Sequence, residues 1–137
     1  MTELSKNFTL EEMVASPTGT RLNIDNRPTK EIKKNLLMLV EKVLQPARDI
    51  WGRPIQVNSG YRCPKLNAAV GGVSSSQHME GKAADITVGS AVANKELFEL
   101  ILKSSISFDQ LIDESDYRWI HVSYNEGKNR NQVLHLK

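Results

Sequence analysis

The sequence is poor in cysteine and in long apolar runs, and both absences limit what the protein can be. Cys63 is the only cysteine among 137 residues, so the chain can form neither an internal disulfide nor a structural zinc site built from thiolates. The fold therefore needs no oxidising compartment. No stretch approaches the roughly 18 consecutive apolar residues that a membrane-spanning helix requires, and the N-terminus lacks the apolar core of a signal peptide. We expect synthesis in the cytoplasm without a signal peptide, and no membrane span.

The net charge is also small. There are 18 basic and 16 acidic residues, which gives a net charge of +2. The basic residues are scattered, and Lys33–Lys34 is the only adjacent pair, so no basic tract is present to follow a phosphate backbone. We therefore expect no nucleic-acid partner. The length and a hydrophobic fraction of 39% are those of an ordinary globular protein. We expect one domain, residues 1–137, and a monomer.

The N-terminal segment Phe8–Met13 predicts a short helix. Thr9 is a suitable N-cap, and Glu12, three residues later, completes a capping box. Proline and glycine follow this segment and should end the helix early. We expect residues 17–28 to form a loop.

A longer helix is predicted from Thr29 to Gly52. Its apolar residues recur at three- and four-residue steps and form one stripe: Ile32, Leu36, Leu37, Val40, Val43, Leu44, Ala47 and Ile50. Pro46 lacks an amide proton and should kink or split the helix near Leu44–Gln45. This helix is the best candidate for the main helix of the core.

The second half of the sequence predicts strands. Short strands are expected at residues 54–58, 84–88, 108–112, 119–124 and 133–136, with a short helix at 65–69 and a longer one that starts at Asn94 and runs to Lys103. Residues 113–118 should join the third and fourth strands as a hairpin. Because helices come first and strands cluster later, we predict an α+β fold with N-terminal helices packed on a mainly antiparallel sheet.

Two of the predicted strands carry a polar side chain that could bind a metal ion. Asp85 and His121 each lie on the face opposite the apolar residues of their strand, and His78 would reach the same place from the preceding loop. Two imidazoles and one carboxylate match a catalytic zinc site, which uses three protein ligands and leaves a position for water. His135, the third histidine, lacks such neighbours and is expected to be structural or solvated.

Other chemistries fit the residues less well. The serines at 74–76 lack the Gly-x-Ser-x-Gly context of a nucleophile, and Cys63 has no activating feature that the sequence can show. The glycines do not follow the spacing of a phosphate-binding loop. A metal hydrolase is the leading hypothesis from the residues alone, and histidines without a metal remain the alternative at this point.

Several motifs, in order along the chain, carry a resemblance to a known family. Ser76–Asp85 resembles the Ser-x-His-x-x-Gly-x-Ala-x-Asp motif of the zinc D-Ala-D-Ala carboxypeptidases, the M15 peptidases. Trp119–Ser123 is similar to their second motif, Trp-x-His, and both Ser59–Arg62 and Phe108–Ile112 match further segments. The resemblance covers about residues 8–125 and looks most like the small phage and prophage branch.

The resemblance implies a fold shared with the hedgehog signalling domain and a Zn²⁺ ion held by His78, Asp85 and His121. It also implies that Arg62 and Ser76 bind polar groups of the substrate, a peptidoglycan stem peptide cut next to a D-amino acid. The implied protein is a carboxypeptidase or an endopeptidase, of the kind that serves as a phage or prophage lysin, and it would act at the cell wall once it is released or delivered.

The sequence departs from the family at the catalytic acid. Many members carry Asp or Glu three residues before the second histidine, where this chain has Arg118, which cannot act as a base at neutral pH. Asp113, Glu114 and Asp116 lie just upstream; the pattern of the phage-like branch selects Glu114, with Asp116 next. If none reaches the metal, the alternative is a catalytically weak zinc-containing binding or structural module of a phage tail or cell-wall complex. A hedgehog-like interaction domain without enzymatic activity is a third hypothesis.

Overall fold

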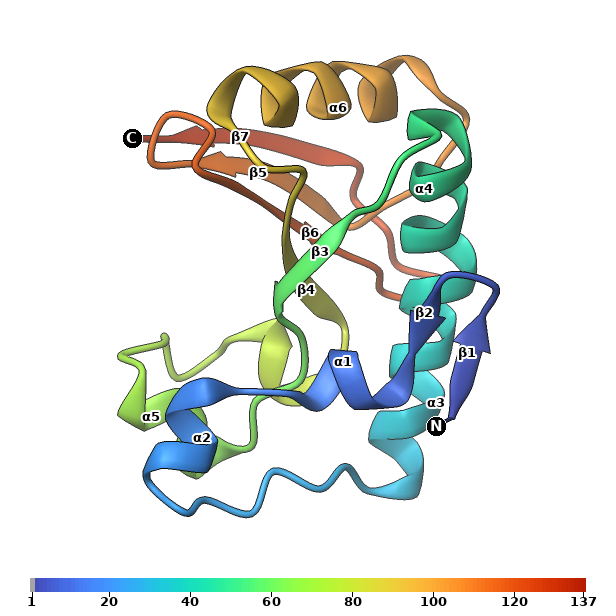
Figure 1. Ribbon diagram of the computed structural model, residues 1–137. Helices are drawn as coiled ribbons and strands as arrows, with labels where there is room; N and C mark the ends of the chain where they lie inside the picture. Colours follow the sequence, from blue (N-terminus) through green and yellow to red (C-terminus); the bar gives the residue numbers. More distant parts are fainter. Residues whose placement is uncertain (1) are drawn as a thin grey trace.

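A five-stranded sheet forms the centre of the computed structural model, which describes residues 2–137 (Figure 1). Its strands are β3 (Gln56–Ser59), β4 (Ala83–Thr87), β5 (Gln110–Glu114), β6 (Trp119–Ser123) and β7 (Gln132–Leu136), in the order β3-β4-β6-β5-β7. Three neighbouring pairs are antiparallel, and β7 runs parallel to β5. The α+β class is confirmed, with a mixed sheet that is antiparallel in all pairs but one.

The chain enters the fold through a small hairpin that the sequence did not predict, β1 (Glu3–Ser5) and β2 (Phe8–Thr9). The predicted capping box is present at the start of α1 (Leu10–Val14): the Thr9 hydroxyl accepts from the Glu12 amide at 3.2 Å, and the Glu12 carboxylate accepts from the Thr9 amide at 2.9 Å. Thus the capping signal located the helix correctly.

The predicted loop over residues 17–28 is wrong in its first part, because α2 (Pro17–Arg21) forms there. Ser16 caps this helix, and its hydroxyl accepts from the Gly19 amide at 3.0 Å. Pro17 stands in the first turn, where its missing N–H would have had no partner within the helix. Pro17 therefore begins a helix at a position where the sequence predicted a loop.

The long predicted helix is continuous and consists of α3 (Lys30–Leu39), η1 (Val40–Leu44) and α4 (Gln45–Trp51), which follow one another in Figure 1. Instead of splitting, it widens into the π-helical turn η1 just before Pro46, where the normal bonding pattern is interrupted because proline has no N–H. Gly52, with φ of 76°, ends the helix as predicted.

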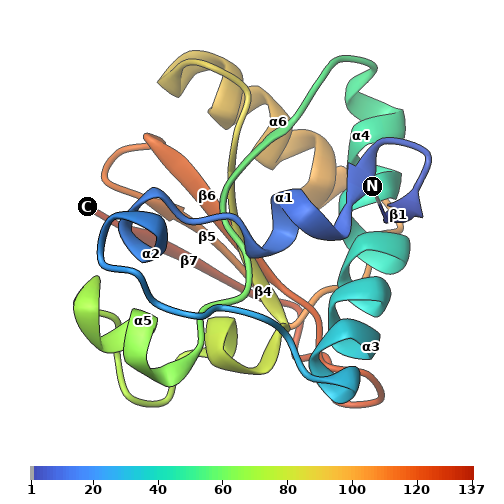
Figure 2. The ribbon, with the colours of Figure 1, turned by 60° about the horizontal axis from the view of Figure 1, so that its bottom comes forward.

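A further helix, α6 (Ala91–Lys103), starts at the N-cap Ser90, earlier than expected. Asn94 lies inside this helix and is fully buried; its amide donates to the carbonyls of Tyr117 and Arg118 at 2.8 and 3.0 Å. It therefore fixes the β5–β6 turn rather than the helix end. In both ribbon views α6 lies at one end of the molecule and α5 (Pro64–Ala69) at the other (Figure 2).

The core lies between the helices and one face of the sheet. It is built from Leu36, Leu39, Val40, Val43, Leu44 and Ala47 of the long helix, Leu97, Phe98 and Ile101 of α6, and Ala84, Ile86, Leu111, Ile120 and Val122 of the sheet. Since side chains alternate along a strand, the residues between these sheet positions face the other way. That second face is where the functional side chains lie. Among the described residues, no helix is both long and apolar enough to cross a bilayer.

Candidate metal centre

The first two predicted ligands come from adjacent strands. Asp85 of β4 is the register partner of His121 of β6, so the two side chains stand opposite each other on one face of the sheet. His121 Nδ1 lies 3.0 Å from Asp85 Oδ1. The same register pairs the buried Ile86 and Ile120 on the core face, so burial of these apolar residues fixes which way the polar pair points.

The third predicted ligand, His78, sits in the 3₁₀ turn η2 (Gln77–Glu80) just before β4. The hydroxyl of Ser76 caps this turn and accepts from the His78 amide at 3.1 Å. His78 Nδ1 lies 2.7 Å from the carbonyl oxygen of Gly60, and a carbonyl can only accept, so Nδ1 carries the proton. The lone pair of Nε2 is then free on the other side of the ring, 3.4 Å from Asp85 Oδ1.

Gly60 has to be glycine for this contact to form. A β-carbon at this position would lie 2.2 Å from the carbonyl oxygen of Met13, which also accepts from the Tyr61 amide at 2.8 Å. The last turn of α1 and the turn after β3 therefore pack backbone to backbone, and this close approach places the Gly60 carbonyl next to His78.

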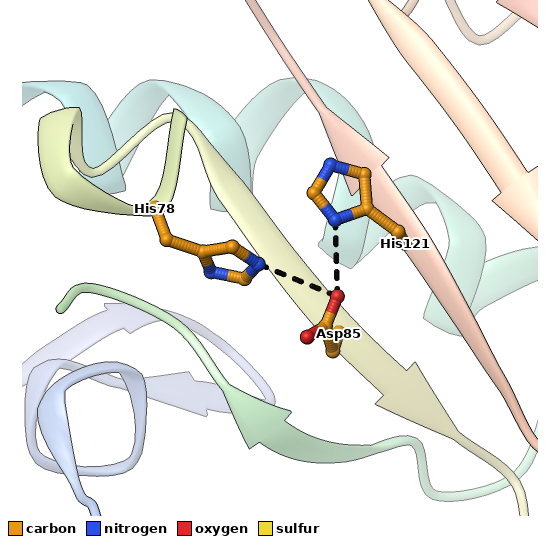
Figure 3. A group of neighbouring side chains, drawn as sticks. All are labelled: His78, Asp85 and His121. Atoms are coloured by element: carbon orange, nitrogen blue, oxygen red, sulfur yellow. Dashed lines mark hydrogen bonds and ion pairs between the residues drawn. The ribbon is translucent and has the colours of Figure 1, made fainter. Parts of the chain in front are cut away.

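The three side chains point toward one another (Figure 3), and their candidate ligand atoms lie within 4.8 Å of one another. Burial alone would raise the pKa of Asp85, but its contacts with the His121 and His78 imidazoles outweigh burial and hold the pKa well below its usual range. The carboxylate is therefore ionised at neutral pH, as metal binding requires. Two imidazole nitrogens and one carboxylate oxygen at this spacing fit a zinc ion with an open coordination position.

Arg62 lies beside this cluster in the turn after β3. Its Nε donates to the Asn67 side chain at 3.2 Å and its Nη1 to Ser59 at 3.4 Å. Burial lowers the pKa of Arg62, while the negative charges of Asp85 and Glu114 act in the opposite direction. The guanidinium thus lies within the field of both carboxylates.

Asn67 is a site residue that the sequence analysis missed. It is 3% exposed, and besides accepting from Arg62 it donates to the carbonyl of Val73 at 2.9 Å. A β-carbon on Gly72 would lie 2.1 Å from Asn67 Oδ1, so the loop can close over this amide only with glycine there. The Gly71–Gly72 pair was the one available signal that the backbone approaches something closely.

The three candidate acids lie in three different environments. Glu114 is on the same face as His121, because Ile112 is the register partner of His121 and Glu114 follows two residues later. Asp113 faces the opposite side, is 4% exposed, and pairs with His135. Asp116, with φ of 55°, is exposed in the turn between β5 and β6. Arg118 is also exposed there. Of the three, strand alternation brings Glu114 alone to the face of the ligand cluster.

A cleft of about 360 Å³ opens along this face. It is lined by Val73, Ser75, Ser76, Gln77, Gln110, Ile112, Glu114, His121, Arg130 and Leu136. Its size is in the range of pockets that hold small ligands or a few residues of a peptide. Ser76 is in the wall, although its hydroxyl is already engaged as the N-cap of η2.

Three ligands of this kind beside an open cleft, with a further carboxylate on the same face, define a mononuclear zinc hydrolase. The sequence model of the Peptidase M15 family matches residues 6–123. The chain therefore belongs to that family, and the predictions of a zinc metallopeptidase and of a Zn²⁺ cofactor are confirmed.

A stretch of 59 residues, 42% of this chain, is 46% identical to the zinc D-Ala-D-Ala carboxypeptidase of Streptomyces albus G. The match covers 23% of that protein, so the chain corresponds to much less than two thirds of its relative's length. The similarity supports the family and the metal.

Proposed function

We propose that this protein is a zinc peptidase that cleaves peptidoglycan stem peptides next to a D-amino acid, as a carboxypeptidase or an endopeptidase. The observation that carries the proposal is the cluster of His78, Asp85 and His121, of which His121 is in the wall of a cleft that also contains Glu114. The name of the Streptomyces albus G relative supports the D-Ala-D-Ala type of substrate. The phage-like motifs favour a single-domain lysin with a hedgehog-like fold, which acts at the cell wall after release or delivery.

In this proposal the zinc ion is held by His78 Nε2, Asp85 Oδ1 and His121 Nδ1, the atoms that face one another. A zinc ion so placed supplies Lewis-acid activation of a carbonyl group and of water. The protein keeps His78 in the required tautomer through the Gly60 carbonyl and keeps Asp85 ionised.

Glu114 is the proposed general base. Its Oε2 accepts from Trp119 Nε1 at 3.3 Å, which orients the carboxylate and leaves Oε1 for the attacking water. The same carboxyl group can then give the proton to the leaving amine. Arg118, at the usual acidic position of the family, cannot take this role because a guanidinium holds its proton at neutral pH.

Arg62 is the proposed site for a carboxylate of the substrate. Its Nε and Nη1 are held by Asn67 and Ser59, which leaves Nη2 for a ligand. A planar guanidinium fixed in this way binds a carboxylate with defined geometry. Ser76 offers a second polar contact in the cleft wall.

A digest of purified muropeptides, followed by mass spectrometry, tests the proposal. The zinc-loaded protein should release a D-amino acid or split a stem, and the mass of the products names the bond. Glu114→Gln should keep zinc and lose cleavage, whereas His135→Ala should change neither. Absence of cleavage by zinc-loaded wild type contradicts the proposed activity, and full activity of Glu114→Gln assigns the base elsewhere.

The second candidate function is a zinc-containing binding or structural module of a phage tail or cell-wall complex. The observation that favours it is Arg118, exposed in the turn where many relatives carry the acid. This module would bind muropeptides and return them uncut, so the same digest separates the two candidates.

A further inference from the structure

A second arginine, Arg130, lines the cleft and is held by a buried carboxylate. Its Nε donates to Asp109 Oδ1 at 2.8 Å and its Nη2 to Asp109 Oδ2 at 2.9 Å. Asp109 is only 1% exposed, whereas the Arg130 side chain is 55% exposed. A two-point contact with a buried partner fixes the plane of the guanidinium while its outer edge stays accessible.

Asp109 connects Arg130 to the loop that carries the metal ligand His78. Gln77 Nε2 donates to Asp109 Oδ2 at 2.8 Å, and the Arg130 amide donates to Asp109 Oδ1 at 3.1 Å. Because carboxylate oxygens only accept, the Gln77 amide must point its nitrogen at Asp109. The position of Arg130 relative to the metal cluster is therefore determined by direct contacts.

The guanidinium keeps unused donors after these contacts. It has five N–H groups, and its described hydrogen bonds involve one on Nε and one on Nη2. The remaining donors are on Nη1 and Nη2 of a side chain that lines the cleft. The Arg130 guanidinium is preorganised to bind an anion, because its orientation is fixed before a ligand binds.

Arg62 and Arg130 come from opposite edges of the sheet. Arg62 follows β3 and Arg130 precedes β7, and these are the two edge strands, with β6 and His121 in the middle of the sheet. Asp85, near Arg62, is on β4, and Asp109, which holds Arg130, directly precedes β5, two strands away.

We propose that Arg130 binds a second carboxylate of the substrate, across the scissile bond from the carboxylate bound by Arg62. The site then selects peptides that carry two carboxylates, one on each side of the bond that is cut. The inference rests on the proposed peptidase function and specifies its substrate class.

The test uses zinc-loaded full-length protein and two synthetic stem peptides that differ in one group, an upstream carboxylate in one and a carboxamide in the other. We expect wild type to prefer the carboxylate peptide about five- to tenfold in kcat/KM, through KM. Arg130→Gln should remove the preference by raising KM for the carboxylate peptide, with kcat and zinc content unchanged. Arg130→Lys, which keeps the charge and loses the fork, should retain part of it.

Arg53→Gln is the matched control, because Arg53 stacks on Trp51 at the end of α4, and this variant should keep the full preference. Equal losses on both peptides in Arg130→Gln, or a preference that survives this substitution, would overturn the inference and leave the peptidase function standing. Wild type that cuts both peptides equally well would overturn it too. Wild type that cuts neither contradicts the proposed function, and this inference with it.

Discussion

Asp85 and His121 face each other as register partners on β4 and β6, with His121 Nδ1 3.0 Å from Asp85 Oδ1. Two of the three candidate ligands are thereby placed by the pairing of the sheet itself, on rigid elements. His78 is placed differently, by the 3₁₀ turn that precedes β4 and by the carbonyl of Gly60. Substitutions at Gly60 and at the histidines therefore test these two contributions separately.

Removing a ligand should remove the metal. We expect wild type to bind one zinc ion per chain, and His78→Ala and His121→Ala to lose it, because two remaining ligands do not hold zinc tightly. His135→Ala is the control, since His135 pairs with Asp113 on the other face of the sheet. Metal analysis by mass spectrometry measures the content. Unchanged zinc in His78→Ala would contradict the assignment of the cluster.

Gly60→Ala should weaken both the fold and the metal site. The new β-carbon would lie 2.2 Å from the Met13 carbonyl oxygen, so the backbone must move, at a cost of roughly 2–3 kcal/mol in the free energy of unfolding. The Gly60 carbonyl would move away from His78 Nδ1, and zinc affinity should fall as well. Denaturant unfolding and zinc titration measure the two effects.

Gly19→Ala is the control for that substitution. A β-carbon on Gly19 would meet its nearest atom at an ordinary 3.4 Å, so this variant should unfold and bind zinc like wild type. If Gly60→Ala behaves like Gly19→Ala, the backbone contact with Met13 is not what holds the Gly60 carbonyl in place.

Gly72→Ala should affect substrate binding and leave the metal in place. The added carbon would displace the Asn67 side chain, whose Oδ1 would be 2.1 Å away, and Asn67 orients Arg62. We expect KM to rise by a few fold while zinc content stays at the wild-type value. A lower kcat at unchanged KM would show that Asn67 acts on the chemical step instead.

The Asp109–Arg130 pair should make stability depend on pH in the acid range. Hydrogen bonds from Arg130 lower the pKa of Asp109 to about 2. When folding lowers the pKa of a carboxyl group, the ionised group stabilises the fold at pH values above its ordinary pKa. This stabilisation is lost as the pH falls through the lowered pKa. Wild type should therefore exceed Arg130→Gln by about 1 kcal/mol near pH 6, a difference that disappears near pH 2.

Denaturant unfolding at several pH values measures this difference, with Arg53→Gln as the control that should show no acid-dependent change relative to wild type. A wild-type advantage over Arg130→Gln that is constant from neutral to acid pH would mean that packing, and not the charge on Asp109, accounts for it.

Local sequence patterns were sufficient for much of the site. Alternation of apolar and polar residues located Asp85 and His121 on the exposed face of their strands, and the same alternation separates Glu114 from Asp113. The Thr9 capping box and the Gly52 helix end were also correct, because each depends on residues within a few positions.

What the sequence could not show depends on contacts between distant segments. Arg130 and Asp109 are 21 residues apart and Asn26 bonds to the carbonyl of Tyr61 35 residues away, so no local pattern reveals either contact. The same is true of β7, whose parallel pairing with β5 follows from the path of the chain. Pro17 was misjudged because the effect of a proline depends on whether its missing N–H would have had a partner in the helix.

The strand β7 brings the end of the chain to the cleft, since Leu136 is in the cleft wall. An affinity tag fused after Lys137 would thus begin next to this cleft, and in assays of the proposed activity it would compete with the substrate for space. The β1–β2 hairpin contributes no residue to the described cleft wall. Tags and fusion partners for assays with large cell-wall fragments are therefore better placed at the N-terminus.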